Sequence, residues 1–523
     1  MWSFKLLTSP ALLLLAVALA QSAVVPARIP MEDTMHPDLS APATKSAFRS
    51  GQVEGEDTQE YWLSLSKQHI REKLNFVRNT KKAKNIILFL GDGMGLATLA
   101  AARSYIGGES EKLSFEQFPY TGLSKTYSVD KIVPDSACTS TSYLCGVKAN
   151  YGTIGVNANV KRGDCAAMAE ENNHVFSLGK WAMDAGKAAG LVTTTRVTHA
   201  SPSGVYAHTA DREWENDALI KEACGADTTL PDIALQLIYG EVGSKLRVML
   251  GGGKRNFYDP ASYEKGRRTD GRNLVEEFQQ LDPNNVFVKN QKKLLKVNAT
   301  ETGRLLGLFS GSHMDYHLEA LDNPDNNEPT LEEMTQKALE ILQTEQNGYF
   351  LFVEGGKIDI SHHDTMARIA LDETAELSKA VALARKMTSE EDTLIVVTSD
   401  HSHTFSLAGY QKRGSDIFGA AESNAADGLP YIGLSYANGM SYEKFYDTVE
   451  HKRVDPTSQL TGDFWEPFPA MAPLVSETHG GEDVGVFASG PWSHLFTGVY
   501  EQNAIPHMMA YAACVGSGLK ACD

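Results

Sequence analysis

The stretch Asn85-Ile-Ile-Leu-Phe-Leu-Gly-Asp92 joins a β-branched, apolar run to a carboxylate. Two more apolar runs end in the same way, Phe350–Val353 before Glu354 and Leu394–Val397 shortly before Asp400. Short runs of this kind, bounded by Gly or Ser, are typical of strands buried on both faces of a parallel sheet. The carboxyl ends of parallel strands meet at one edge, where open α/β sheets bind their ligands. We therefore expect three carboxylates to gather at one edge of a sheet.

Carboxylates gathered in a pocket repel one another and lose hydration unless a cation compensates, so the pattern predicts bound metal. Histidines lie near two of the acidic segments. His401 directly follows Asp400, and Asp359 and His363 are four residues apart, on one face if the segment is helical. Imidazole with carboxylate suits zinc, whereas ligands that are all oxygen suit magnesium. The sequence therefore predicts metal sites of both kinds.

Strands and helices alternate through most of the chain. Helical spacing of apolar residues occurs at 58–77, 97–105, 137–147, 176–188, 331–344 and 374–388, and further strand patterns at 191–195, 246–250 and 484–488. This alternation predicts an α/β fold with a large central, mostly parallel sheet flanked by helices on both faces. From about 410 to 475 the pattern gives way to Gly, Asn, Asp, Ser and Pro between aromatic residues, which indicates a small β-rich inserted subdomain. We expect one large domain over 21–523 that carries this insertion.

Charge and the two ends of the chain bear on partners and compartment. The formal net charge of -18 and the shortness of the basic stretches argue against nucleic-acid binding. Residues 1–20 combine Lys5, an apolar stretch and an Ala-Leu-Ala ending, the pattern of a secretory signal peptide and too short for a membrane span. The polar ending at Asp523 offers no hydrophobic tail for a glycolipid anchor. We expect a secreted, extracellular protein without a membrane anchor.

Export would place the six cysteines in an oxidising compartment, where disulfides form. Residue types alone leave about 15 complete pairings open. Cys514 and Cys522 are close enough in the chain to pin the C-terminus. The tripeptide Asn298-Ala299-Thr300 is a glycosylation sequon, so Asn298 is a candidate acceptor.

Ser136 lies in the segment Pro134-Asp135-Ser136-Ala137, just before a run of helical composition. A residue there would lie near a helix N-terminus, where backbone N–H groups favour an anion. Taken alone, an Asp-Ser pair before a helix is more often a cap than a nucleophile. No G-x-S-x-G sequence surrounds Ser136, which disfavours a hydrolase of the Ser-His-acid type. If Ser136 is a nucleophile, its activation has to come from metal.

Seven motifs, taken in order, resemble those of animal alkaline phosphatases, and the chain looks insect-like among them. The motifs are Leu90-Gly-Asp-Gly-Met-Gly95, Asp135-Ser-Ala137, Thr198-His-Ala-Ser-Pro202, Val353-Glu-Gly-Gly356, Ile358-Asp359 with His363, Ser399-Asp-His-Ser-His403 and Glu477-Thr-His-Gly-Gly-Glu-Asp483. The resemblance runs from about Val53 to Cys522. It implies that Ser136 is the nucleophile.

The resemblance also implies ligands for three metal ions. They are Asp359, His363 and His479 for one zinc, Asp92, Asp400 and His401 for a second zinc beside Ser136, and Asp92, Ser201 and Glu354 for magnesium. Arg212 matches the arginine whose planar fork binds two phosphate oxygens. His199 fits a residue near the magnesium ligands, with a water-mediated or a structural role.

The implied activity is hydrolysis of phosphate monoesters at alkaline pH through a phosphoserine intermediate, with two Zn²⁺ and one Mg²⁺ per subunit of a homodimer. Residues 58–77 and the 410–475 insertion are the expected interface. Broad substrate choice follows, because the implied ligands hold only the phosphoryl group. By the same resemblance Cys165 pairs with Cys224 and Cys514 with Cys522, which leaves the other two cysteines free and buried.

Several positions depart from the family pattern or leave alternatives. Ile360 stands where relatives often carry a basic or imidazole side chain, so phosphate affinity and the pH optimum stay open. Ser310 replaces an acid that binds calcium in vertebrate members, with Glu328 as the one acid that aligns. His362 and His403 are assigned to the core or to the surroundings of the ligands. One alternative is a related phosphodiesterase or sulfatase, which the motif set with Arg212 disfavours. The other is a secreted metal- or phosphate-binding protein without turnover, which the presence of Ser136 and every ligand disfavours.

Overall fold

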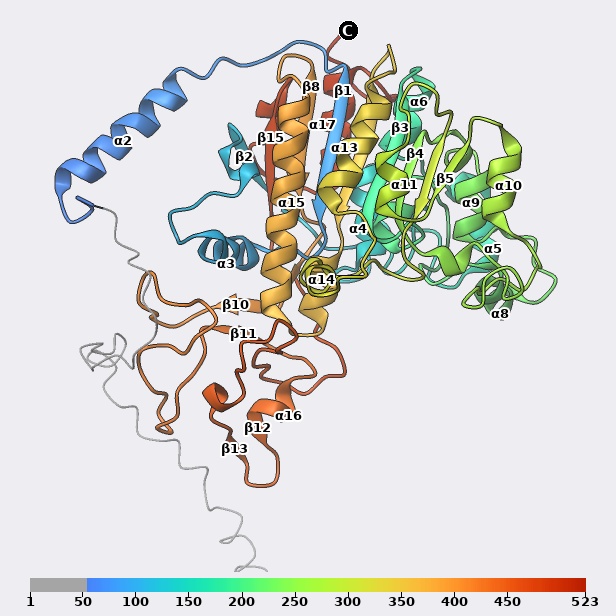
Figure 1. The fold of residues 1–523 in the computed structure, drawn as a ribbon. Helices are drawn as coiled ribbons and strands as arrows, with labels where there is room; N and C mark the ends of the chain where they lie inside the picture. Colours follow the sequence, from blue (N-terminus) through green and yellow to red (C-terminus); the bar gives the residue numbers. More distant parts are fainter. Residues whose placement is uncertain (1–53) are drawn as a thin grey trace, which may run out of the picture. The chain divides into compact units, whose positions relative to one another are not determined.

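A ten-stranded sheet organises the part of the chain that the structure describes, residues 54–523 of a computed structural model (Figure 1). The signal peptide expected at 1–20 lies outside the described residues. The strand order is β16-β2-β15-β8-β1-β7-β3-β4-β6-β5. These strands are β1 Asn85–Gly91, β2 Tyr120–Lys125, β3 Ala188–Arg196, β4 Val248–Gly252, β5 Val286–Val288, β6 Leu305–Leu308, β7 Tyr349–Gly355, β8 Thr393–Thr398, β15 Val484–Ser489 and β16 Gly498–Glu501. Among them only β15 is antiparallel to its neighbours, which confirms the predicted mostly parallel sheet.

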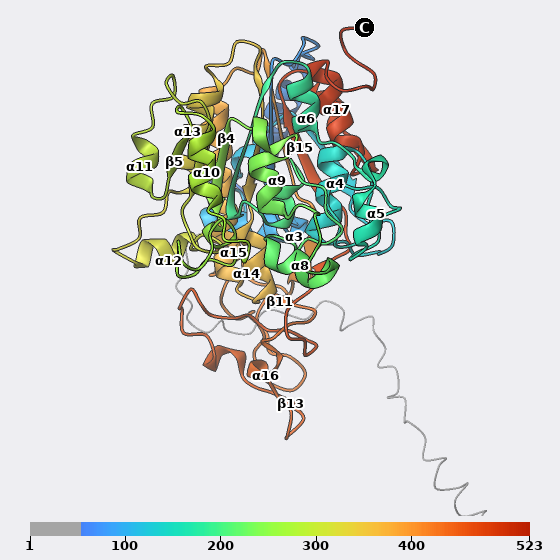
Figure 2. The same cartoon turned by 90° about the vertical axis from the view of Figure 1, so that its right-hand side faces the viewer.

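Helices cover both faces of this sheet (Figure 2). Ile87 and Phe89 of β1 pack into one core with α3, α13 and α15, while Ile86, Leu88 and Leu90 pack into the other with α4, α6, α9 and α17. Because the central strands β1, β7 and β8 bury both faces, their sequences are nearly continuous apolar runs. The helices are α2 Gln59–Leu74, α3 Leu96–Ile106, α4 Ser136–Cys145, α5 Cys165–Ala169, α6 Leu178–Asp184, α7 Ala200–Ser203, α8 Asp217–Cys224, α9 Ile233–Tyr239, α10 Leu274–Leu281, α11 Gln291–Leu295, α12 His317–Asp322, α13 Leu331–Leu342, α14 Lys357–His363, α15 Ala367–Met387, α16 Tyr442–Phe445 and α17 Ala504–Ala513.

Two predicted helices differ from the structure by more than three residues at one end. The segment 176–188 is not one helix, because α6 ends at Asp184 and β3 already begins at Ala188. Between them Gly186 has a φ of 77°, in the left-handed region that favours glycine and ends helices. The helix expected from residue 374 begins earlier, at Ala367, since the preceding turns also bury apolar side chains against the core.

Three small antiparallel pairs follow β8; one lies wholly within the predicted insertion at 410–475, one has a single strand there, and one lies outside it. The pairs are β10 Phe405–Leu407 with β11 Leu434–Tyr436, β12 Tyr446–Asp447 with β13 Lys452–Arg453, and β9 Ser402–His403 with β14 His479–Gly480. Figures 1 and 2 place β11, β13 and α16 at the end of the sheet where α14 lies. This end is the one that carries the carboxyl ends of β1 and β8. The domain limits of 21–523 and about 410–475 stay predictions.

Four of the six cysteines form disulfides, Cys165 with Cys224 and Cys514 with Cys522, as the family resemblance implied. The two others, Cys138 and Cys145, are free and buried. Within residues 54–523 no helix combines the length and the apolar character needed to cross a membrane.

Candidate metal centre

Three buried carboxylates meet at the carboxyl ends of neighbouring strands. β1 lies between β7 and β8, and its Leu90 is opposite Glu354 on one side and Thr398 on the other. Asp92 directly follows β1, and Asp400 comes two residues after Thr398. All three carboxylates are inaccessible to solvent. The sheet therefore brings together the acids that the sequence predicted at one edge.

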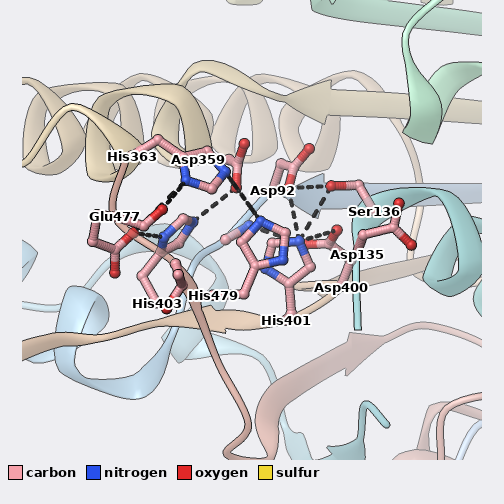
Figure 3. Close-up of polar contacts among 12 residues, drawn as sticks. Asp92, Asp135, Ser136, Asp359, His363, Asp400, His401, His403, Glu477 and His479 are labelled. Carbon is pink, nitrogen blue, oxygen red and sulfur yellow. Dashed lines mark hydrogen bonds and ion pairs between the residues drawn. The ribbon is translucent and has the colours of Figure 1, made fainter. Parts of the chain in front are cut away.

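Ser136 is the first residue of α4, and its hydroxyl points into this cluster (Figure 3). Ser136 Oγ lies 3.4 Å from Asp92 Oδ1 and 3.2 Å from His401 Nε2. Asp135 is the N-cap of the helix, and its Oδ1 accepts a hydrogen bond from the backbone N–H of Cys138. Ser136 is thus both a helix-start residue and a neighbour of the buried acids, beside N–H groups that favour an anion.

A histidine-rich group surrounds Asp359 on α14. Asp359 and His363 are one helical turn apart, and Asp359 Oδ1 lies 3.4 Å from His363 Nε2. His479 Nε2 lies 3.3 Å from the same oxygen and 3.1 Å from His363 Nε2. Two imidazole nitrogens and a carboxylate oxygen so close together match the donor set of zinc. The three residues predicted for one zinc therefore lie side by side.

A second group of donors lies beside Ser136. His401 Nε2 is 3.1 Å from Asp400 Oδ2 and 3.6 Å from Asp92 Oδ1, and all three side chains are fully buried. This group again offers one imidazole and two carboxylates, which suits zinc. It includes the residues predicted for the second zinc and shares Asp92 with the next group.

A third, oxygen-rich group lies on the other side of Asp92. Asp92, Glu354 and His199 each offer a ligand atom, and these atoms lie within 4.8 Å of one another. Ser201 Oγ, from α7, donates to Asp92 Oδ2 at 3.4 Å. Carboxylate and hydroxyl oxygens are ligands that magnesium prefers. The predicted magnesium ligands are therefore also brought together, with His199 next to them.

The raised pKa values of two buried carboxyl groups in these donor groups are consistent with bound cations. Burial raises the pKa of Asp92 well above its usual range, and the neighbouring carboxylates of Asp400, Asp359 and Glu354 raise it further. Burial likewise raises the pKa of Glu354 to about 7, against the hydrogen bonds from threonine hydroxyls. Glu354 Oε1 has no hydrogen-bond partner in the described part of the chain. Divalent cations would satisfy this oxygen and stabilise the ionised carboxylates.

Arg212 is anchored next to the serine. Its Nη1 donates to Asp135 Oδ2 at 2.9 Å, and its Nη2 lies 3.1 Å from His199 Nε2. Because Asp135 precedes Ser136 in the chain, this ion pair holds the guanidinium close to the hydroxyl. Its remaining N–H donors suit two oxygens of a phosphate.

Two further residues support the centre. His403 Nε2 lies 2.8 Å from Asp359 Oδ1, and His403 Nδ1 lies 2.6 Å from Glu477 Oε2 (Figure 3). The sequence left open whether His403 belongs to the core or to the surroundings of the ligands. Its contacts show that it belongs to the surroundings of the ligands. Glu477 had no predicted role, although it stands two residues before His479 in one of the motifs. His362 belongs to the core, between Thr98 and Tyr436.

A serine at a helix N-terminus, next to three groups of buried metal-type ligands at one edge of a parallel sheet, is the arrangement of a metal-dependent hydrolase of the α/β class. The family model for alkaline phosphatase matches residues 83–515. The chain belongs to the alkaline phosphatase family. It is an enzyme, a metal-binding phosphoric monoester hydrolase.

Relatives match nearly the whole chain. A membrane-bound alkaline phosphatase of Bombyx mori is 44% identical over 94% of this chain and 91% of its own length. An alkaline phosphatase of Gadus morhua is 43% identical over 89% of this chain and 99% of its own. Solved alkaline phosphatases from the Antarctic bacterium TAB5 and from Thermus thermophilus have TM-scores of 0.58 and 0.61, at 23% and 24% identity. They cover 84% and 86% of this chain and 100% and 95% of their own, and they show the fold.

Proposed function

We propose that the chain hydrolyses phosphate monoesters at alkaline pH through a phosphoserine intermediate, with two Zn²⁺ and one Mg²⁺ per subunit. The observation that carries this proposal is the place of Ser136 Oγ, 3.4 Å from Asp92 Oδ1 and 3.2 Å from His401 Nε2. Arg212 is anchored on the adjacent Asp135. A hydroxyl between a two-cation donor set and a phosphate-binding guanidinium suits attack on phosphorus.

Three donor groups would hold the ions. They are Asp359, His363 and His479 for one zinc, Asp92, Asp400 and His401 for the other, and Asp92, Ser201 and Glu354 for magnesium. When bound, the ions lower the pKa of nearby hydroxyl groups and offset negative charge on the phosphoryl oxygens and the departing alcohol.

Residues of the chain position the reacting atoms. Asp92 and His401 hold Ser136 Oγ, which loses its proton and attacks phosphorus as the bond to the alcohol oxygen breaks. Arg212 donates N–H groups to two phosphoryl oxygens, while Asp135 keeps the guanidinium oriented. The departing alcohol oxygen takes up, through solvent, the proton that Ser136 released. Water then cleaves the bond between phosphorus and Ser136 Oγ, which releases phosphate and restores the hydroxyl.

Hydrolysis of p-nitrophenyl phosphate by the metal-loaded protein tests the nucleophile. Ser136→Ala removes the attacking oxygen, and we expect kcat to fall by about 10³-fold or more. Ser142→Ala, on the same helix and also buried, is the matched control and should keep its activity. Undiminished activity of Ser136→Ala would refute the assignment. Faster turnover of bis(p-nitrophenyl) phosphate than of the monoester would favour the phosphodiesterase alternative.

Metal analysis tests the ion content independently of turnover. We expect about two zinc ions and one magnesium ion per chain, since two donor groups contain imidazole and one is oxygen-rich. His479→Ala should lose one zinc, because it removes a donor from the group around Asp359. A fully active preparation without zinc would rule out the proposed ion set.

Export, glycosylation and dimerisation are part of the same proposal. The two disulfides support a secreted, extracellular protein, because disulfides persist in oxidising compartments. Asn298 is exposed, as a glycan acceptor has to be. Helix α2 has no buried residue, and Ile70 and Leu74 on it are 56% and 78% exposed. Exposed apolar surface supports α2, with the 410–475 insertion, as the interface of a homodimer.

A further inference from the structure

A cavity of about 550 Å³ lies between residues 125–132 and residues 481–483, with Tyr127, Val129, Ile132 and Gly481 in its lining. This volume is in the range of small-molecule sites. We propose that the cavity binds the alcohol part of the substrate and selects monoesters whose alcohol has an aromatic or aliphatic body. The inference rests on the proposed function and adds a substrate class to it.

The cavity lies at the same edge of the sheet as the metal centre. Residues 126–132 follow β2, and residues 481–483 precede β15, whose Val484 pairs with Ser124 at the end of β2. β15 is antiparallel to β8, so it begins next to the carboxyl end of β8. Asp400 follows that same end of β8. The cavity therefore lies at most two strands away from the clustered carboxylates.

The two chain segments that lead from the reacting groups to the cavity wall lie against each other. His479 Nδ1 lies 2.8 Å from the carbonyl oxygen of Pro134, two residues before Ser136. A Cβ placed on Gly481 would lie 3.2 Å from Val133 Cγ2, so the segments that carry Ser136 and His479 pack against each other. Ile132 and Gly481 extend these two segments into the cavity wall.

The geometry of the proposed in-line reaction places the leaving alcohol on the side of the metal centre that faces the cavity. Ser136 attacks from the group that contains Asp92 and His401, next to which its Oγ lies. In an in-line displacement the alcohol leaves on the opposite side of phosphorus. The donor group of Asp359 and His479 would then face the alcohol oxygen. Gly481 is two residues from His479 in the chain, so an alcohol body that extends past His479 would run toward the wall formed by residues 132 and 481.

The lining favours an apolar body. Ile132 is 84% exposed and Tyr127 is 45% exposed, so both present uncovered apolar surface. The charges of Lys125 and Lys148 are compensated by Glu501, at 3.2 Å and 2.9 Å. Lys148 Nζ also lies 3.2 Å from the ring centroid of Tyr127. Asp130, Lys131 and Asp483 also line the cavity, so its apolar wall is the part formed by Tyr127, Val129 and Ile132. Burying hydrocarbon against that part favours an alcohol with an apolar body.

The test compares 2-phenylethyl phosphate with glycerol 1-phosphate, both esters of alkyl alcohols of similar leaving ability. We expect kcat/KM to favour the phenylethyl ester about tenfold, as burial of a few methylene equivalents predicts. The double variant Val129→Gln/Ile132→Gln should bring this ratio close to one. Leu281→Gln, an equally polar change of an exposed apolar residue on α10, should leave both kcat/KM values unchanged.

Binding without turnover gives the second measurement. The dissociation constants of 3-phenylpropylphosphonate and 3,4-dihydroxybutylphosphonate, measured by calorimetry, should show the same preference and the same loss in the double variant. Equal kcat/KM for the two esters, or an unchanged ratio in the double variant, would refute the proposed subsite. Neither result would contradict the proposed phosphomonoesterase activity. If the wild-type protein hydrolysed neither ester, the proposed function would fall and the subsite with it.

Discussion

Glu477 is a buried carboxylate that acts on the centre through another residue. Its Oε1 accepts the backbone N–H of Thr404 at 2.7 Å, and its Oε2 is bound to His403. Burial alone would lower the pKa of His403, but Glu477 and Asp359 raise this pKa to about 10. Through its 2.8 Å contact, His403 fixes one oxygen of Asp359. Partners of this kind orient metal ligands and tune their affinity.

Glu477→Gln should weaken zinc binding at the group around Asp359. The amide keeps the shape but removes the negative charge that binds and orients His403, so we expect the zinc dissociation constant to rise about 10- to 100-fold. Competition with a chromogenic chelator measures this constant. Glu450→Gln, an exposed glutamate of the insertion, is the control. Equal zinc affinity in the variant and the wild type would show that Glu477 is merely structural.

Glu373 of α15 makes stability depend on pH. Burial raises its pKa from 4.5 to about 7, and the described residues include no cationic side chain in an ion pair with it. Because the folded pKa is above the ordinary value, its contribution to stability is complete below pH 4.5 and is lost as pH rises through 7. Glu373→Gln should therefore be more stable than wild type at pH 8, by about 2 kcal/mol, but not at pH 4.5. Urea unfolding at both pH values measures the difference, and equal pH dependence of the two proteins would contradict it.

At the scale of elements, the disulfides tie short helices to the rest of the chain. The bond between Cys165 and Cys224 joins α5 to α8 across a sequence separation of 59, whereas the bond between Cys514 and Cys522 closes a separation of 8. Closing the longer loop restricts the unfolded chain more. The two bonds should therefore contribute unequally.

Replacing both cysteines of a pair by serine measures each contribution. We expect a loss of about 4 kcal/mol for the pair at 165 and 224, and about 2.5 kcal/mol for the pair at 514 and 522, from loop entropy. The free energy of unfolding in urea, with the wild type as reference, gives both values. A larger loss from the C-terminal pair would mean that loop length does not set the order.

At the scale of the whole molecule, α2 decides the assembly that we propose. Among its uncovered apolar side chains, Leu63, Ile70 and Leu74 lie on one face of the helix. Ile70→Glu places a charge in that face and should convert the dimer to a monomer, which sedimentation velocity detects as a halved mass. Ser64→Glu, on the polar face of α2, should leave the dimer intact. A monomeric wild type, or a dimer that tolerates Ile70→Glu, would exclude α2 from the interface.

The fold class and the edge of the sheet that binds ligands could be read from the order of residues. Strands buried on both faces are recognisable as continuous apolar runs, and the acids that follow them share an edge because parallel strands end together. The proposed serine nucleophile and histidine ligands needed more, namely seven motifs in sequence, since a single Asp-Ser pair or His residue is compatible with a cap or a core position.

Contacts between segments that are distant in the chain could not be predicted from the sequence. Local periodicity reports that a face is buried and says nothing of what covers it. Pro134 and His479 are 345 residues apart, and only folding places the imidazole against the carbonyl oxygen and forms the cavity beside them. The same holds for the bond from Glu477 through His403 to Asp359, and for the pairing of β15 against the direction of β8. These features depend on which elements the packed core brings side by side, and that is a property of the whole chain.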